Sequence, residues 1–170
     1  MIKNGFIKTC CISPKLSVGM PLVNAKEIVD AINISKASIN LFPELCVTGY
    51  SCGDLFFNET LLKENEEAIL YIVENNKENV LTIIGAPLVQ EGALYNCAIV
   101  IFGKEILGIV PKTNLVRAKE FNDPRYFTSG EEFIDNMFKK PIVFLEFFSI
   151  ISILKIFFIT FEYMDKLITL

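Results

Sequence analysis

The sequence of 170 residues contains no histidine and no tryptophan. Without histidine it cannot form a Ser-His-Asp triad, use a histidine general base or bind zinc through an HExxH motif. Any acid–base or nucleophilic chemistry must therefore come from Glu, Asp, Lys, Cys, Tyr or Ser side chains.

Cysteine occurs in an odd number, and its spacing fits neither a disulfide framework nor a zinc site. The five cysteines are Cys10, Cys11, Cys46, Cys52 and Cys97, and no two of them have CxxC spacing. Zinc sites need better-spaced ligands and commonly use histidine, so we expect no metal. We expect reduced thiols in a cytoplasmic protein.

Basic residues are outnumbered and scattered along the chain. There are 16 Lys and Arg against 20 Asp and Glu, which gives a net charge of −4 and a pI near 5.0. This distribution lacks the basic patch that nucleic acids require, so we expect no nucleic-acid partner. Lys3 and Lys8 are not followed by the apolar core of a signal peptide. The length suits one domain with a hydrophobic core.

Hydrophobic periodicity predicts alternating strands and helices. The predicted strands cover residues 5–12, 38–43, 80–84, 94–102 and 105–110, and the predicted helices begin after Asn24 and Asn58. Asn24 with Glu27 has the spacing of a capping box, and Gly103-Lys104 predicts a tight turn. The order β-α-β-α-β-β-β favours an α/β layered fold with two helices on one face of a mixed sheet.

Two charged residues come directly after predicted strands. Glu44 follows Pro43, which ends the strand 38–43, and Lys112 follows Pro111, which ends the strand 105–110. Ligands bind outside the carboxyl ends of strands in open α/β sheets, so we expect both groups at one edge, within about 8 Å. The alternative from position alone is a loop-capping or solvated Glu and a surface Lys.

Several motifs occur in the order found in the nitrilase (carbon–nitrogen hydrolase) superfamily. They are Phe-Pro-Glu-Leu-Cys-Val-Thr-Gly-Tyr at 42–50, Gly-Ala-Pro at 85–87, Leu-Tyr-Asn-Cys-Ala-Ile-Val at 94–100, Gly-Ile-Val-Pro-Lys at 108–112, Glu-Phe at 120–121, Arg-Tyr-Phe at 125–127 and Gly130. Residues 5–130 resemble most closely the N-terminal glutaminase domain of glutamine-dependent NAD synthetase.

The resemblance implies a nitrilase-like α-β-β-α sandwich, present here in part, and a site for amide hydrolysis. In that pattern Glu44 and Lys112 match two of three catalytic residues, and Glu120 matches a further carboxylate. Tyr50 and Arg125 are implied as substrate-binding or supporting residues. A thiol attacks the glutamine carboxamide, a carboxylate takes the thiol proton and an ammonium stabilises the oxyanion.

The resemblance also implies partners. The implied substrate is glutamine, and in the resembled family the released ammonia feeds ATP-dependent amidation of deamido-NAD. No cofactor belongs to this domain, because ATP and Mg²⁺ serve the synthetase half, whose Ser-Gly-Gly loop does not occur in this sequence. Full-length members of the family are homo-oligomers.

The third catalytic residue has no match. The family's nucleophile lies in a Glu-Ile-Cys-Glu-Asp-like segment several dozen residues after the lysine, whereas no cysteine follows Cys97 here. Cys46 and Cys52 are interpreted as small buried hydrophobes, and the chain is expected to be inactive as a glutaminase. It is either a truncated or frame-altered gene product or a genuine short homologue. The alternatives are a stand-alone nitrilase-type amidase and a non-catalytic α/β interaction module.

The domain is expected to cover residues 1–133, with an apolar tail from 134 to 170. Residues 142–163 carry only Glu146, Lys155 and Glu162 as charged groups. This length could span a bilayer. A central Glu146 and Lys155 would each cost about 2.5–3.5 kcal/mol, against about 0.3–0.6 kcal/mol gained per apolar residue. We therefore expect buried strands or a core helix, and a membrane location is disfavoured.

Overall fold

The computed structural model describes residues 6–118 and 121–131, which form an α/β fold as predicted. Its elements are β1 (Thr9–Cys11), α1 (Pro21–Ile34), β2 (Ile39–Leu41), the 3₁₀ segment η1 (Tyr50–Phe57), α2 (Glu59–Asn75), β3 (Leu81–Gln90), β4 (Ala93–Phe102), β5 (Glu105–Pro111), β6 (Arg117–Ala118), β7 (Phe121–Asn122) and the 3₁₀ segment η2 (Asp123–Arg125).

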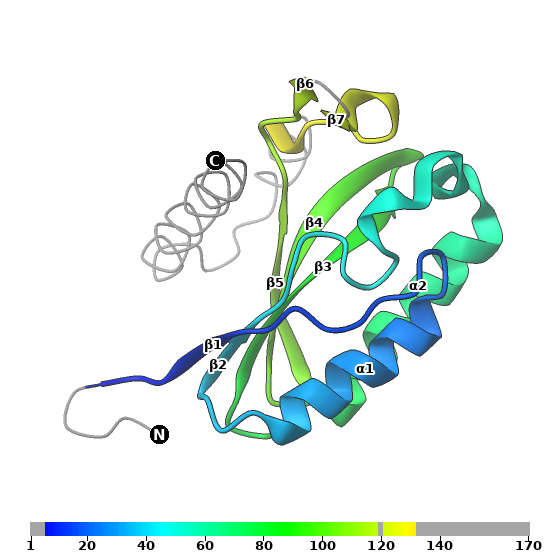
Figure 1. Ribbon diagram of the computed structural model, residues 1–170. Coiled ribbons are helices and arrows are strands. Elements are labelled where there is room, and N and C mark those ends of the chain that lie inside the picture. The colour runs from blue at the N-terminus through cyan, green and yellow to red at the C-terminus, as the bar shows by residue number, and fades with distance from the viewer. Residues whose placement is uncertain (1–5, 119–120, 132–170) are drawn as a thin grey trace, which may run out of the picture. The chain divides into compact units, whose positions relative to one another are not determined.

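Five strands form one mixed sheet in the order β1-β2-β3-β4-β5, and β6 pairs with β7 separately. β1, β2 and β3 are parallel, whereas β4 is antiparallel to both β3 and β5. Parallel neighbours need long crossover connections, which α1 and α2 supply. Figure 1 shows both helices on the same side of the sheet, as the sequence predicts.

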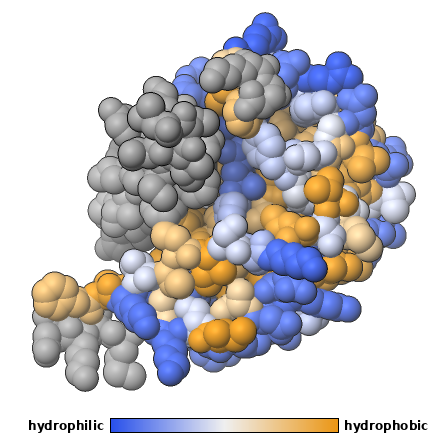
Figure 2. Space-filling model, viewed as in Figure 1, coloured by the Kyte–Doolittle hydropathy of each residue, from blue (hydrophilic) through white to orange (hydrophobic). Residues whose placement is uncertain are grey.

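The core lies between these helices and the sheet. The apolar positions of the helices recur at helical spacing and are buried together with strand residues; they are Ala25, Ile28, Val29, Ile32, Ala68, Ile69, Ile72, Val73, Ile84, Ala86, Ile99 and Ile101. A fully buried aliphatic side chain of this size contributes about 1.5–3 kcal/mol. The outer surface is mixed in polarity (Figure 2), with Val18, Met20 and Phe57 among the exposed large apolar residues.

The prediction that Asn24 caps the first helix is wrong. The helix begins at Pro21, because proline at the first helical position has no N–H to satisfy and a φ suited to the helix. Asn24 is fully buried, accepts a hydrogen bond from the Ser17 N–H (2.7 Å) and donates to the carbonyls of Ser17 and Val47 (2.9 Å each). It therefore fastens two loops to α1.

The predicted cap of the second helix is confirmed. Asn58 precedes α2, and its side-chain oxygen accepts hydrogen bonds from the backbone N–H groups of Thr60 (2.9 Å) and Leu61 (3.3 Å). These donors have no partner within the helix, so the cap stabilises its first turn.

β3 is longer than the predicted strand 80–84, since it continues to Gln90 and pairs with β4 along its whole length. Pro87 does not interrupt it. β2 ends at Leu41, opposite Ile83, so on this side of β3 no strand needs a hydrogen bond from the backbone nitrogen of Pro87. The turn after β4 is tight, as predicted, with Gly103 in the left-handed region at a φ of 57°. β1 and β2 are shorter than predicted.

The loop after β2 follows the extended part of β3. Phe42 N–H donates to the Ile83 carbonyl (2.9 Å), and Val47 N–H donates to the Gly85 carbonyl (3.2 Å). A Cβ at Gly85 would lie 2.4 Å from the Leu45 nitrogen, 2.7 Å from the Pro43 oxygen and 2.8 Å from Glu44 Cα. The absence of a side chain at this position therefore lets the Glu44 loop approach the sheet.

No helix among residues 6–118 and 121–131 is long and apolar enough to cross a membrane. The predicted domain boundary at 133 and the apolar segment 142–163 lie outside the described residues.

Gly85→Ala should destabilise the protein by about 3 kcal/mol or more, because the new methyl group meets backbone atoms that cannot move aside easily. Gly92→Ala is the control, since its Cβ would meet nothing within 4 Å and only its φ of 78° adds strain, at about 1–2 kcal/mol. Chemical denaturation measures both losses. Equal losses would contradict the close approach at Gly85.

Candidate active site

Glu44 and Lys112 are brought together by strand direction. β5 and β3 are both antiparallel to β4, so β2, β3 and β5 run in the same direction and their carboxyl ends share one edge of the sheet. Lys112 follows β5, and its N–H donates to the Asn96 carbonyl (2.8 Å). Lys112 Nζ lies 2.9 Å from Glu44 Oε1. The predicted meeting of the two groups at one edge is confirmed.

Two further side chains complete this cluster. Asn96, on β4, donates from Nδ2 to the same oxygen of Glu44 that binds Lys112. Asp123 binds the other side of the ammonium, with Oδ2 lying 2.8 Å from Lys112 Nζ. The exposed fractions of the side chains are 24% for Glu44, 16% for Lys112 and 4% for Asp123. The ammonium is thus shared between two largely buried carboxylates.

Asp123 is itself held on both oxygens. The Val116 N–H donates to Oδ2 (3.1 Å), and the Tyr50 hydroxyl donates to Oδ1 (3.0 Å). Because Asp123 begins η2 and Tyr50 begins η1, this carboxylate links the segment that follows Lys112 to the segment that follows Glu44.

The charges of this cluster stabilise one another. Burial by itself lowers the pKa of the Lys112 ammonium, but the hydrogen bonds and charges of Asp123 and Glu44 outweigh it and raise that pKa above 10.5. Burial by itself raises the pKa of Asp123, but Lys112, the Val116 N–H and the Tyr50 hydroxyl together bring it below 3.8. Lys112 and Asp123 are therefore both charged at neutral pH.

The other predicted site residues lie in different surroundings. Tyr50 contacts Asp123, whereas Arg125 forms a surface ion pair, with Nη2 lying 2.8 Å from Asp54 Oδ1. The Arg125 guanidinium also lies over the Tyr126 ring, 5.6 Å from its centroid. Glu120 lies outside the described residues.

Sequence reasoning missed Asp123 and Asn96. The signal for Asp123 is the Asp-Pro dipeptide at 123–124, which favours a turn and places a carboxylate in a short loop after Lys112. The signal for Asn96 is a polar residue inside the apolar strand 94–102, because a buried amide needs a hydrogen-bonding partner. Neither pattern predicts that Asp123 contacts Lys112 or that Asn96 contacts Glu44.

The cysteines nearest to this region in sequence belong to the core. Cys46 is fully buried, its thiol donates to the Gly85 carbonyl (3.6 Å), and burial raises its pKa to about 12. Cys52 is 5% exposed with a raised pKa, because burial outweighs its hydrogen bonds. The interpretation of Cys46 and Cys52 as small buried hydrophobes is confirmed.

Cys97 is buried on the opposite face of β4 from Asn96, since neighbouring side chains of a strand alternate between faces. Burial raises its pKa to about 12.

The described part of the chain contains no group of three or more His, Cys, Asp or Glu side chains that could hold a metal ion.

Comparison with known proteins places the chain in a family. The model of the carbon-nitrogen hydrolase family matches residues 14–145. The chain belongs to the carbon–nitrogen hydrolase family. The resemblance found in the sequence motifs is therefore confirmed.

The relatives of this carbon–nitrogen hydrolase domain are larger proteins. The glutamine-dependent NAD(+) synthetase of Mycobacterium tuberculosis (strain H37Rv) is 32% identical over 133 residues, which cover 76% of this chain and 20% of that protein. The synthetase of Aquifex aeolicus is 37% identical over 112 residues, which cover 64% and 20%. The chain thus spans about a fifth of the length of these relatives and is homologous to their glutaminase region.

Solved structures agree with the fold. The glutamine-dependent NAD+ synthetase of Acinetobacter baumannii superposes with a TM-score of 0.69 at 28% identity, covering 73% of this chain and 24% of that one. An amidase of the nitrilase superfamily from Nesterenkonia superposes with a TM-score of 0.60 at 17% identity, covering 73% and 48%. The amidase likeness supports the fold alone.

Asp123→Asn should weaken the protein by about 2 kcal/mol at neutral pH, because Lys112 loses one charged hydrogen-bonding partner. A carboxylate with a lowered pKa stabilises the fold above its unfolded value of 3.8, and this contribution is lost as the pH falls through the folded value. The variant should therefore show a flatter stability profile below about pH 4.

Denaturation across pH 2–7 measures this difference, and Asp54→Asn serves as the surface control. If stability falls equally with decreasing pH in the wild type and in Asp123→Asn, Asp123 does not contribute as described.

Lys112 has the opposite pH dependence. Its raised pKa stabilises the fold below 10.5, and this contribution disappears as the pH rises through the pKa of the folded state.

The thiols should react in order of exposure. Cys11 is exposed, whereas Cys46 and Cys97 are buried with pKa values of about 12, so few thiolates form at pH 8. We expect iodoacetamide to modify Cys11 readily and to modify Cys46 and Cys97 only after unfolding. Peptide mass spectrometry measures each site, and early labelling of Cys46 would contradict its burial.

Proposed function

We propose that this carbon–nitrogen hydrolase domain holds the acid–base and oxyanion-stabilising part of a site that hydrolyses the amide of glutamine. The observation that carries the proposal is the 2.9 Å pair of Glu44 and Lys112 at the sheet edge. The homology to the glutaminase region of glutamine-dependent NAD(+) synthetases supports glutamine as the amide.

In the proposed reaction, Glu44 accepts the proton of a thiol while the sulfur attacks the carboxamide carbon. The carbonyl oxygen becomes an oxyanion, which the Lys112 ammonium stabilises by charge and hydrogen bonding. The proton held by Glu44 passes to the departing nitrogen, which leaves as ammonia. Water then hydrolyses the thioester, returns a proton to the sulfur and releases glutamate.

The cysteines of this sequence do not suit the nucleophile's part. Burial raises the pKa of Cys46, Cys52 and Cys97, and burial together with the neighbouring Cys10 raises the pKa of Cys11. Cys10 lies inside β1. A thiolate is the reactive form, so a raised pKa opposes attack. We therefore propose that the 170-residue chain by itself does not release ammonia from glutamine.

The proposal also covers the setting of the reaction. The chemistry uses side chains and water, and ATP and Mg²⁺ would serve a synthetase half rather than this domain. Five free cysteines support a reducing, cytoplasmic compartment. Arg125, which ties η2 to η1 through Asp54, is assigned a supporting role, and Glu120 is kept as a further carboxylate of the site. Assembly with further copies of the chain is part of the same proposal.

Glutamine binding and ammonia release test the two parts of this proposal separately. We expect the chain to bind glutamine, detected as a shift of the Lys112 side-chain signals in NMR titration, without releasing ammonia. Glu44→Gln and Lys112→Met should each weaken binding at least about tenfold, since each removes a charged hydrogen-bonding group. Glu66→Gln and Lys63→Met, both on the exposed side of α2, are the matched controls.

Other outcomes decide between the alternatives. Ammonia release that disappears in Cys46→Ala or Cys52→Ala would overturn the proposed inactivity by revealing a nucleophile. Binding or hydrolysis confined to asparagine, acetamide or propionamide would replace glutamine with another amide. A folded chain that binds none of these amides would be an interaction module.

A further inference from the structure

The hydroxyl of Tyr50 reaches a carboxylate that already serves the catalytic lysine. It donates to Asp123 Oδ1 (3.0 Å), while Asp123 Oδ2 accepts from Lys112 Nζ (2.8 Å) and from the Val116 N–H (3.1 Å). Lys112 Nζ in turn contacts Glu44 Oε1 at 2.9 Å. A continuous chain of hydrogen bonds thus runs from Tyr50 through Asp123 and Lys112 to Glu44.

The ring of Tyr50 is held on one side by a neighbouring aromatic ring, although the residue is 37% exposed. It packs edge-on against Phe121, with ring centroids 5.7 Å apart and an interplanar angle of 77°. Edge-to-face pairs of this kind contribute beyond simple burial. The backbone before it is also constrained, because Gly49 has a φ of 90° and a Cβ there would lie 3.2 Å from Val18 Cα.

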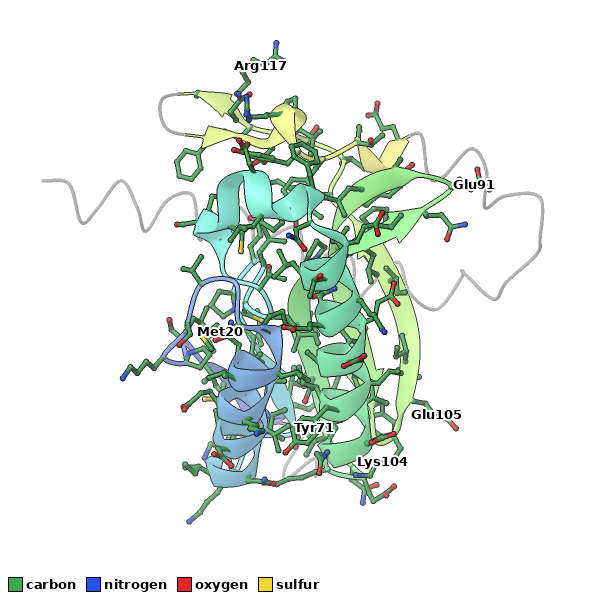
Figure 3. The ribbon with its side chains drawn as sticks, turned by 90° about the vertical axis from the view of Figure 1, so that its right-hand side faces the viewer. Met20, Tyr71, Glu91, Lys104, Glu105 and Arg117 are labelled. Atoms are coloured by element: carbon green, nitrogen blue, oxygen red, sulfur yellow. The ribbon has the colours of Figure 1, made fainter. Side chains whose placement is uncertain are left out.

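Other contacts hold the same two segments together. Figure 3 shows the cyan η1 beside the yellow segment that carries β6, β7 and η2. Phe56 of η1 packs against Phe127 with ring centroids 5.0 Å apart and against Tyr126 at 5.6 Å. Asp54 of η1 pairs with Arg125 of η2. The hydrogen bond from Tyr50 to Asp123 is thus one of several contacts between η1 and the segment that carries η2.

Asp123 gains from such a donor. The carboxylate torsion of an aspartate is broad, so donors on both oxygens hold its orientation more firmly than the two donors on Oδ2 alone. Asp123 is 4% exposed, and a buried carboxylate oxygen without a donor is costly. A hydroxyl on Oδ1 removes this cost and restricts the torsion further.

We propose that Tyr50 is a positioning residue that acts on Lys112 through Asp123. Its hydroxyl sets the orientation of the Asp123 carboxylate, and that carboxylate keeps the Lys112 ammonium beside Glu44. The inference rests on the proposed function for the catalytic part of Lys112, but the arrangement itself is measurable without any substrate.

The test replaces the hydroxyl and keeps the ring. In Tyr50→Phe, the pKa of Asp123 should rise towards 3.8, because the charged form loses a donor, and the pKa of Lys112 should fall towards 10.5 as the pair loosens. NMR titration of the Asp123 carboxyl carbon and the Lys112 ε-carbon in the full chain measures both. Tyr71→Phe, on α2 at the margin of the core, is the matched control and should move neither.

A role for Tyr50 in packing alone would give a different result. Such a role predicts unchanged titrations in Tyr50→Phe, and so does no role at all; either result would overturn the proposal. Equal shifts in Tyr50→Phe and Tyr71→Phe would overturn it too, since the effect would then be global.

A second experiment keeps the tyrosine, so its result does not depend on whether Tyr50→Phe folds. Uniform 3-fluorotyrosine labelling makes the hydroxyl a stronger donor and should move the pKa of Asp123 further down. An unchanged Asp123 titration in the labelled protein would count against the proposal. Shifted titrations in a chain that binds no glutamine would support the role of Tyr50 and reject the proposed function instead.

Discussion

The ammonium of Lys112 is the interaction on which the site depends. It lies 2.9 Å from a Glu44 oxygen and 2.8 Å from an Asp123 oxygen, and both carboxylates are largely buried. Two carboxylates this close would repel each other without a cation between them, and the repulsion would protonate or displace one of them. Because Glu44 lies in the loop after β2 and Asp123 begins η2, Lys112 also fixes where these two segments meet.

The sheet makes this meeting possible through strand direction and strand length. β3 runs past the end of β2, and the freed side of β3 receives the loop that carries Glu44. Gly85 allows the approach because a side chain there would collide with that loop. Asn96 connects the parts from β4: its carbonyl binds the Lys112 N–H, and its amide binds the Glu44 carboxylate.

The cluster has the electrostatic components of amide hydrolysis. A carboxylate can accept a proton and an ammonium can stabilise an oxyanion, but neither supplies the thiol that forms the acyl intermediate. The thiols of Cys46 and Cys97 are buried, and burial disfavours the thiolate. The side chains of this cluster therefore supply charge and positioning but no nucleophile. The proposed glutamine binding and the proposed lack of turnover can therefore be tested by separate measurements on this chain.

The sequence by itself determined the features that depend on neighbouring residues. The spacing of apolar residues indicated both helices, Asn58 marked the start of α2, and the prolines at 43 and 111 marked Glu44 and Lys112 as residues beyond strand ends. The shared edge could also be predicted, because functional groups of α/β sheets gather beyond the carboxyl ends of the strands. The family motifs added the chemistry expected of that edge.

Only the tertiary structure decided which side chains meet there. Asp123 reaches Lys112 and Tyr50, Asn96 reaches Glu44 across 52 positions of sequence, and Asn24 fastens loops instead of capping α1. A local pattern reports on residues within a turn of helix or along one strand. The partner of a buried polar group is set instead by which distant segments pack against it, and hydrogen-bonding need alone does not name that partner.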